Sequence, residues 1–261
     1  MQARTSTEHP VLETERLTIR FGGHVAVNNV SCAFQPGTLT AIVGPNGAGK
    51  TTYFNLISGQ LAPSEGRVRL FGEDITRFAA PRRARRGIGR AFQLTNLFPN
   101  LTVLENARLA VQSRAGVGLD MVSIWSSRVE LVEKAEHVLH RVALTERRDA
   151  VTSTLSHGDQ RKLEVGILLA LEPEVFMFDE PTAGMSVDEV PVILELIQQI
   201  KAEGDKTVLL VEHKMDVVRA LADRIVVLNN GALVADGAPG EVMALPVVRE
   251  IYLGAGEEEV A

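Results

Sequence analysis

The chain has 261 residues, of which 45% are hydrophobic, and a net charge of −6 at pH 7. This length supports one large or two small globular domains, and the acidic balance argues against a protein dedicated to nucleic acid. The single cysteine, Cys32, excludes an internal disulfide and favours a reducing compartment. No apolar run reaches the roughly 18 residues of a membrane span. Residues 1–10 are polar, so no signal peptide is expected, and another chain would have to hold this protein at a membrane.

The first quarter of the chain predicts a series of strands separated by turns. Alternating residues predict the first strand, and a second strand region follows the turn at Phe21-Gly22-Gly23. Pro36 and Gly37 then form a turn before a short apolar run with the length and composition of a buried strand. The predicted strands are 11–20, 25–34, 39–43 and 66–71.

A phosphate-binding loop follows the apolar strand 39–43. Residues 44–52 fit the pattern G-x-x-x-x-G-K-[ST], and a helical pattern over 51–58 ends at Gly59. Glycines let the loop turn its N–H groups inward as an anion nest, and the new helix directs its positive dipole end at the phosphates. The alternative is an ordinary glycine-rich turn, which the flanking strand and helix disfavour. The candidate residues are Gly44, Pro45, Asn46, Gly47, Ala48, Gly49, Lys50, Thr51 and Thr52.

Within this loop, two side chains have distinct chemistry. Lys50 can act as a mobile point charge on the β- and γ-phosphates, and the Thr51 hydroxyl can ligate Mg²⁺. The sequence therefore predicts a site for a nucleoside triphosphate with magnesium.

The middle of the chain is expected to be helical. The basic stretch 82–86 could be a nucleic-acid patch, but it is short, and we favour a solvated helix face. Residues 93–155 are far too many for a loop. Helical patterns over 100–111 and 128–142 predict a helical subdomain inserted into an α/β core.

After residue 155, helices and strands alternate, which predicts a mostly parallel sheet covered by helices. We expect helices at 160–171, 187–202 and 215–222, strands at 175–178, 207–211 and 225–228, and a frayed polar tail over 254–261.

Acidic and histidine side chains follow two of these strands. Asp179 and Glu180 end the strand that starts at Val175, and His213 follows the strand 207–211. Because functional groups of parallel sheets gather at the carboxyl ends of strands, we expect these residues beside the phosphate loop. Asp179 suits Mg²⁺, Glu180 can polarise an attacking water as general base, and His213 can bond a γ-phosphate oxygen. Alone, each would be interpreted as a structural strand end.

Several motifs together resemble those of ABC-transporter ATPase subunits. They are residues 44–52, Gln93, Leu155-Ser156-His157-Gly158-Asp159, residues 176–182 and His213, in the family's order and approximate spacing. The resemblance covers nearly the whole chain, and the Leu155 element is the family's signature. Further features resemble the bacterial importers of branched-chain amino acids and urea: Arg20-Phe21-Gly22-Gly23, residues 98–106, Leu155-Ser156-His157-Gly158, Glu180-Pro181-Thr182-Ala183-Gly184-Met185, Val211-Glu212-His213, and Tyr252-Leu253-Gly254.

The resemblance implies roles for individual residues. Phe21 would stack on adenine, although a core position at a strand end is the plain alternative. Gln93 would contact the Mg²⁺ and the attacking water and carry the signal to the helical subdomain. Ser156 and the Gly158 N–H would contact the γ-phosphate of a nucleotide held by a second copy of the subunit. In this arrangement Glu180, His213, Gln93 and Lys50 are catalytic, and Thr51, Gln93 and Asp179 hold the metal.

Two residues depart from the family's pattern. In the signature, Asp159 stands where glutamine is usual, and an acidic side chain facing a phosphate is unfavourable. We therefore expect Asp159 to cap its own helix. Ser186 stands where aspartate often couples the two ATP sites, and the resemblance implies that role for this position.

The resemblance implies a single ABC ATPase domain over 1–261, with a P-loop core and mostly parallel sheet. Its parts are an N-terminal antiparallel β subdomain with the first part of the core (11–92), an inserted helical subdomain with the signature loop (93–158), the rest of the core (159–254) and a tail expected to be disordered (255–261).

The implied function is ATP hydrolysis that powers import of an amino acid or similar small polar solute. The implied partners are two membrane-spanning permease subunits, a second ATPase subunit in a head-to-tail dimer and, indirectly, an extracytoplasmic solute-binding protein, with no nucleic acid. The cofactors would be ATP and Mg²⁺, and the protein would be cytoplasmic and peripheral on the inner face of the membrane. Two alternatives are an ABC-type ATPase acting on nucleic acid, disfavoured by the lack of zinc modules and heptads, and a P-loop phosphotransferase, which would not need the signature loop.

Overall fold

The computed structural model describes residues 9–91, 97–116, 129–185 and 188–255. The chain divides into two compact units, which are described separately below. The first comprises residues 1–88, 174–180 and 200–261, and the second comprises residues 89–173 and 181–199. In the part of the chain that the structure describes, no helix is long and apolar enough to span a membrane.

The first unit contains an antiparallel sheet with the strand order β2-β1-β4-β5. Its long hairpin is made of β1 (Leu12–Phe21) and β2 (His24–Phe34), and β4 (Glu65–Leu70) pairs with the other side of β1. These strands confirm the N-terminal antiparallel part of the expected fold. The short edge strand β5 (Glu73–Asp74) was not predicted.

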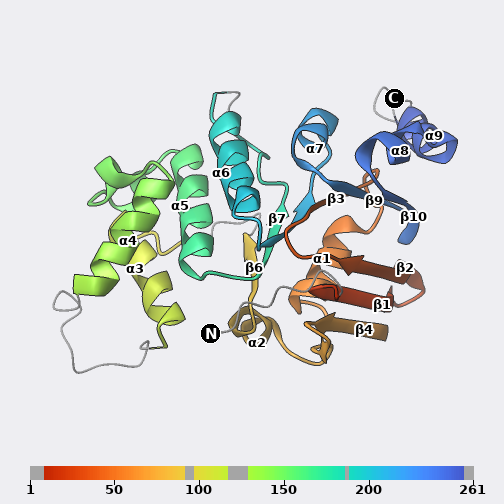
Figure 1. Cartoon of the computed structure of the whole chain (residues 1–261), viewed down its shortest axis with the longest axis horizontal. Helices are drawn as coiled ribbons and strands as arrows, with labels where there is room; N and C mark the ends of the chain where they lie inside the picture. Colours follow the sequence, from red (N-terminus) through yellow and green to blue (C-terminus); the bar gives the residue numbers. More distant parts are fainter. Residues whose placement is uncertain (1–8, 92–96, 117–128, 186–187, 256–261) are drawn as a thin grey trace. The chain divides into compact units, whose positions relative to one another are not determined.

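The first unit also contains a mostly parallel sheet, in which the strand order is β10-β9-β3-β8-β7 (Figure 1). Parallel pairs join β3 (Leu39–Val43) to β8 (Thr207–Val211) and β9 (Arg224–Asn229), and β8 to β7 (Val175–Asp179). All residues of β3, β7 and β8 are buried, as their apolar sequences predict. The antiparallel edge strand β10 (Ala232–Gly237) was not predicted.

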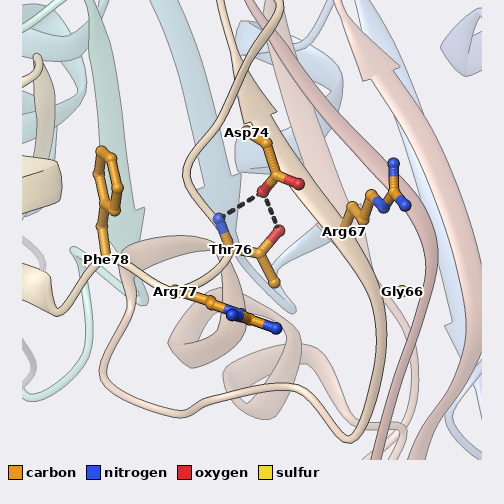
Figure 2. Close-up of a pocket in the computed structure, with 6 residues that line it drawn as sticks. All are labelled: Gly66, Arg67, Asp74, Thr76, Arg77 and Phe78. Atoms are coloured by element: carbon orange, nitrogen blue, oxygen red, sulfur yellow. Dashed lines mark hydrogen bonds between the residues drawn. The ribbon is translucent and has the colours of Figure 1, made fainter.

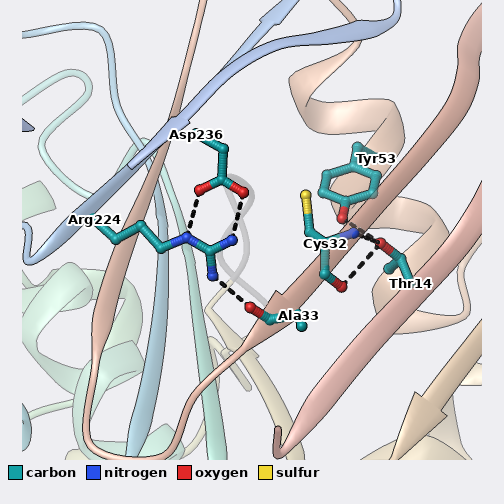
Figure 3. A network of polar contacts seen from close by, with 6 residues as sticks. All are labelled: Thr14, Cys32, Ala33, Tyr53, Arg224 and Asp236. Atoms are coloured by element: carbon teal, nitrogen blue, oxygen red, sulfur yellow. Dashed lines mark hydrogen bonds and ion pairs between the residues drawn. The ribbon is translucent and has the colours of Figure 1, made fainter. Parts of the chain in front are cut away.

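A polar network connects both sheets of this unit with helix α1 (Lys50–Ser58), as Figure 3 shows. Arg224 of β9 donates to both carboxylate oxygens of Asp236 at 2.5 Å and also to the carbonyl of Ala33 on β2. The hydroxyl of Tyr53 on α1 forms a 2.7 Å hydrogen bond with that of Thr14 on β1. Because these groups are paired with partners, the network stabilises the packing of α1, which is the helix that follows the phosphate loop.

Residues 82–85 of the basic stretch lie in helix α2 (Ala80–Arg85), and the prediction of a solvated helix face is wrong at Arg83. Arg83 is 1% exposed. Its guanidinium donates to backbone carbonyls of two segments, the end of α1 and the loop before α2. It binds the carbonyls of Leu56 and Ile57 at 2.7 Å, at the end of α1, and those of Thr76 and Phe78 at 2.7 and 2.9 Å. Burial lowers the pKa of Arg83 to about 10, and Asp74 acts in the opposite direction.

Replacing Arg83 by alanine should destabilise the protein by about 3 kcal/mol, because buried carbonyls lose their donors. The free energy of unfolding in urea measures this effect. Arg85→Ala on the same helix is the matched control, since Arg85 is exposed and should change stability by less than about 0.5 kcal/mol. Equal effects of the two substitutions would contradict the role assigned to Arg83.

The second unit contains helices α3 (Val103–Arg114), α4 (Val129–Arg141) and α5 (His157–Ala170), which pack on one another (Figure 1, yellow to blue-green). The helical prediction for this stretch is confirmed, with shifted ends. Helix α3 begins at Val103 and not at residue 100 because Thr102 and Glu105 form a capping box. Helix α5 begins at His157, three residues earlier than predicted, because Ser156 caps it.

The remaining elements complete the chain. Helix α6 (Val190–Ala202) runs from the second unit into the first, and strand β6 (Ile88–Ala91) lies where the chain passes from the first unit to the second. In the first unit, α7 (Met215–Leu221) follows β8 as expected. Helices α8 (Pro239–Ala244) and α9 (Pro246–Ala255), which were not predicted, end the described chain.

Candidate functional site

The phosphate loop connects the buried strand β3 to α1, as predicted. Gly49, the residue before α1, has φ 93°, and a Cβ there would lie 2.4 Å from the carbonyl oxygen of Ala26. A residue larger than glycine would therefore be strained and would clash with the backbone of β2. The loop is also held from the β9–β10 turn, where the Gly231 N–H donates to the carbonyl of Ala48 at 3.1 Å.

Lys50 lies inside this loop and is 8% exposed. Its Nζ donates to the carbonyl oxygens of Gly44 at 2.7 Å and Pro45 at 2.9 Å. Burial lowers the pKa of Lys50, while the negative charges of Glu180 and Asp179 act in the opposite direction. The ammonium group is thus held by two acceptors that phosphate oxygens can replace.

The strand register places the other candidate residues at the same edge of the sheet. Val211, the last residue of β8, pairs with Ile42 of β3 on one side and with Asp179 of β7 on the other. Since all three strands are parallel, the segments that follow them begin at the same edge of the sheet. The phosphate loop, the Asp179–Glu180 pair and His213 therefore come together, as the sequence predicts.

Glu180 has a strained backbone. Its φ is 48°, in the left-handed region that residues with a Cβ rarely adopt, and its N–H donates to the carbonyl of Val211 at 2.9 Å. Such a conformation costs on the order of 1–3 kcal/mol and is concentrated at functional sites. The side chain is one-quarter exposed, so its carboxylate is accessible to a water molecule.

His213 is paired with two carboxylates. Its Nδ1 lies 3.9 Å from Oε1 of Glu180 and 3.7 Å from Oε2 of Glu212. Glu212 is fully buried and also accepts a 3.1 Å hydrogen bond from the His213 backbone N–H. In the sequence, Glu212 belongs to the motif Val211-Glu212-His213 that resembles the importers, but no role was predicted for its carboxylate.

The signature loop lies in the second unit and forms the start of α5. The Ser156 hydroxyl accepts a 3.1 Å hydrogen bond from the Asp159 N–H and is the N-cap. The prediction that Asp159 caps its own helix is therefore wrong. Its carboxylate accepts a 2.8 Å bond from Lys162 one turn further along, so its charge is balanced within α5.

Gly158 lies directly against Glu189, which precedes α6. A Cβ at Gly158 would be 1.9 Å from Oε1 of Glu189, so a larger residue there would have to displace the Glu189 side chain. No motif in the sequence marks Glu189, and only the tertiary structure reveals its proximity to the signature loop.

The remaining predicted site residues have mixed outcomes. Phe21, at the end of β1, is 50% exposed, which disagrees with the core alternative and leaves its ring accessible for stacking. Gln93 and Ser186 lie outside the described residues, so the structure does not bear on their expected roles.

A pocket of about 390 Å³ lies elsewhere in the first unit, and Figure 2 shows the residues that line it. Asp74 accepts from the Thr76 N–H at 2.9 Å and from its hydroxyl at 2.5 Å, and these bonds lower the pKa of Asp74. The carboxylate is therefore committed to its own turn. None of the residues that line this pocket belongs to the predicted site, and we assign it no ligand.

The donor set at the sheet edge suits magnesium. Mg²⁺ prefers one or two protein oxygens and completes its octahedron with water and phosphate oxygens. Asp179, 2% exposed at the end of β7, and Thr51, in the first turn of α1, supply such oxygens. Among the described residues no cluster of three His, Cys, Asp or Glu side chains could hold a metal by protein ligands alone.

The phosphate loop, the strand-end carboxylates and a helical unit with a capped signature loop define an ATP-binding cassette. A family model described as ABC transporter matches residues 27–183, and the chain belongs to that family as its ATPase. One relative is the high-affinity branched-chain amino acid transport ATP-binding protein BraF of Pseudomonas aeruginosa. It is 39% identical over 250 residues, which cover 94% of this chain and 98% of BraF.

Solved structures agree with this assignment. A crystal structure of the ADP conformation of an ATP-binding cassette from an ABC transporter has a TM-score of 0.80 and 32% identity, and the match covers 94% of this chain and 98% of the other. A dimeric ATP-binding cassette in a post-hydrolysis state, bound to ADP and phosphate, has a TM-score of 0.74 and 26% identity, covering 87% of this chain and 98% of the other. The expected fold class, the ABC ATPase activity and the binding of ATP are thereby confirmed.

Proposed function

We propose that this chain hydrolyses ATP to drive uptake of a branched-chain amino acid, or a similar small polar solute, through separate membrane subunits. The observation that carries the proposal is the likeness to BraF over nearly the full length of both chains. A solute-binding protein outside the membrane selects the cargo, and this chain works as a peripheral protein on the cytoplasmic face.

In the proposed mechanism, ATP joins two ATPase subunits that lie head to tail. The second subunit is either another copy of this chain or a paralogue. The Ser156 hydroxyl accepts a bond from within α5, so its own proton is available to donate to a γ-phosphate held by the partner. The amino end of α5 adds a favourable dipole. Because the γ-phosphate is bound from both sides, its loss on hydrolysis removes the link and the subunits separate.

We assign the chemistry within each copy to the residues at the sheet edge. Lys50 and the loop amides bind the phosphates, and Thr51, Asp179 and Gln93 hold Mg²⁺. When bound, the ion neutralises charge on the β- and γ-phosphates. Glu180 orients and polarises the attacking water, and His213 bonds a γ-phosphate oxygen. The exposed ring of Phe21 stacks on adenine.

An apolar surface on the second unit supports contact with the membrane subunits. Phe98 is 56% exposed and Val151 is 41% exposed. The two segments are joined, because the Ser153 N–H donates to the Pro99 carbonyl at 3.0 Å and Thr102 forms a β-bridge with Val151. We propose that this surface, Phe98 with Val151, receives the permease.

A disulfide-trapping experiment tests the head-to-tail dimer. One preparation carries Asn46→Cys in the phosphate loop, the other His157→Cys in the signature loop, and both carry Glu180→Gln to preserve ATP. A cross-linked dimer should form when the two preparations are mixed with ATP and Mg²⁺. It should not form when they are mixed with ADP, or when either preparation is used alone. The native Cys32 should not interfere, because it is buried and burial raises its pKa to about 11. Cross-linking that ignores nucleotide, or that occurs within one preparation, would contradict this arrangement.

A further inference from the structure

The C-terminal helix α9 reaches the beginning of the phosphate loop through Tyr252. This side chain packs against the buried cluster that covers one face of the parallel sheet. The cluster includes Ala41 and Val43 of β3, and Val43 directly precedes Gly44. Tyr252 therefore packs in the same cluster as the last residue of the strand that leads into the phosphate loop.

The hydroxyl of Tyr252 is in an unusual environment. Its oxygen is buried and has no hydrogen-bond partner of normal geometry among the described residues. Burial raises the pKa of Tyr252 to about 12, and the nearby backbone amide of Gly44 acts in the opposite direction. A buried hydroxyl without a partner costs free energy, so phenylalanine would serve better if packing were the only role.

The same glycine is tied to Lys50. The Lys50 ammonium occupies the carbonyls of Gly44 and Pro45. Phosphate oxygens compete for that ammonium, and when Lys50 turns to them the carbonyls of Gly44 and Pro45 lose their donor. The buried hydroxyl of Tyr252 is a further polar group beside the Gly44 backbone.

We propose that Tyr252 is a positioning residue, whose hydroxyl binds the Gly44 backbone when Lys50 turns to the phosphates and so holds the loop in its nucleotide-binding shape. Nothing in the transport cycle proposed above uses α9. This inference needs only ATP binding at the phosphate loop, so it can fail while the proposed transport function stands.

The test is Tyr252→Phe in the full-length protein, with Glu180→Gln to prevent hydrolysis. Without nucleotide, the thermal midpoint should rise, because an unpaired buried hydroxyl has been removed. The Kd for ATP with Mg²⁺ should rise about three- to tenfold, as expected for the loss of one hydrogen bond. These opposite changes, measured by calorimetry, distinguish positioning from packing, since packing is kept by phenylalanine.

The other tyrosine offers a matched control. Tyr53 is also buried, but its hydroxyl is bonded to Thr14 at 2.7 Å, so Tyr53→Phe should lower the thermal midpoint without nucleotide. Unchanged ATP affinity in Tyr252→Phe would overturn the proposal, as would a loss of affinity accompanied by a lower midpoint. Failure of the parent protein to bind ATP would instead contradict the nucleotide site itself.

Discussion

Replacing Glu180 by glutamine should lower the rate of ATP hydrolysis about 10²- to 10⁴-fold and leave ATP binding intact. The amide retains the size of the side chain but cannot take a proton from water. The strained backbone at φ 48° is held by a bond to Val211 and does not depend on the charge, so the site should keep its shape. Phosphate release measures the rate, and size-exclusion chromatography with ATP should show a persistent dimer.

A control for this substitution is available on the same strand. Glu174 precedes β7 at its opposite end and pairs with Lys206 at 3.4 Å, away from the phosphate loop. Glu174→Gln should hydrolyse ATP at nearly the parent rate. If Glu180→Gln did so as well, another group would be the general base. Loss of ATP binding in Glu180→Gln would indicate that the carboxylate serves the structure of the site.

Replacing Lys50 by alanine should weaken ATP binding at least about 100-fold. Two charge-assisted hydrogen bonds from Lys50 to the β- and γ-phosphates are lost, and each contributes about 1.5–3 kcal/mol to binding. The carbonyls of Gly44 and Pro45 also lose the donor that orders the loop. Calorimetric titration with ATP measures the affinity, and uptake of labelled leucine by vesicles containing the assembled transporter should fall to background.

Lys134→Ala is the charge-matched control for Lys50→Ala. Lys134 is exposed on α4, so its loss changes the net charge equally without touching the phosphate loop. ATP affinity and uptake should both be retained. An affinity for ATP that was unaffected in Lys50→Ala would mean that the loop amides bind the phosphates without help from the side chain.

Local sequence was sufficient for the elements whose signal lies within a few residues. The apolar run before Gly44, the helix after it and the glycine at 59 identify the phosphate loop, because strand, nest and helix start are all short-range structures. The same holds for β7 and β8, whose continuous apolar residues indicate strands buried on both faces. Helix boundaries were predicted less well, because side-chain caps set them. Helix α5, for example, begins three residues earlier than predicted because Ser156 caps it.

By itself, then, the sequence determined the class of fold, the phosphate loop and the strands that carry Asp179, Glu180 and His213, since these follow from periodicity and motif spacing. Only the tertiary structure decided which distant groups meet. It buried Arg83 among carbonyls from two segments and placed the hydroxyl of Tyr252 beside the first glycine of the loop. The bond from Arg83 to Leu56 spans 27 residues, and Tyr252 lies in the last helix whereas Gly44 follows the third strand. Such contacts depend on strand order and helix packing, so no local pattern along the chain encodes them.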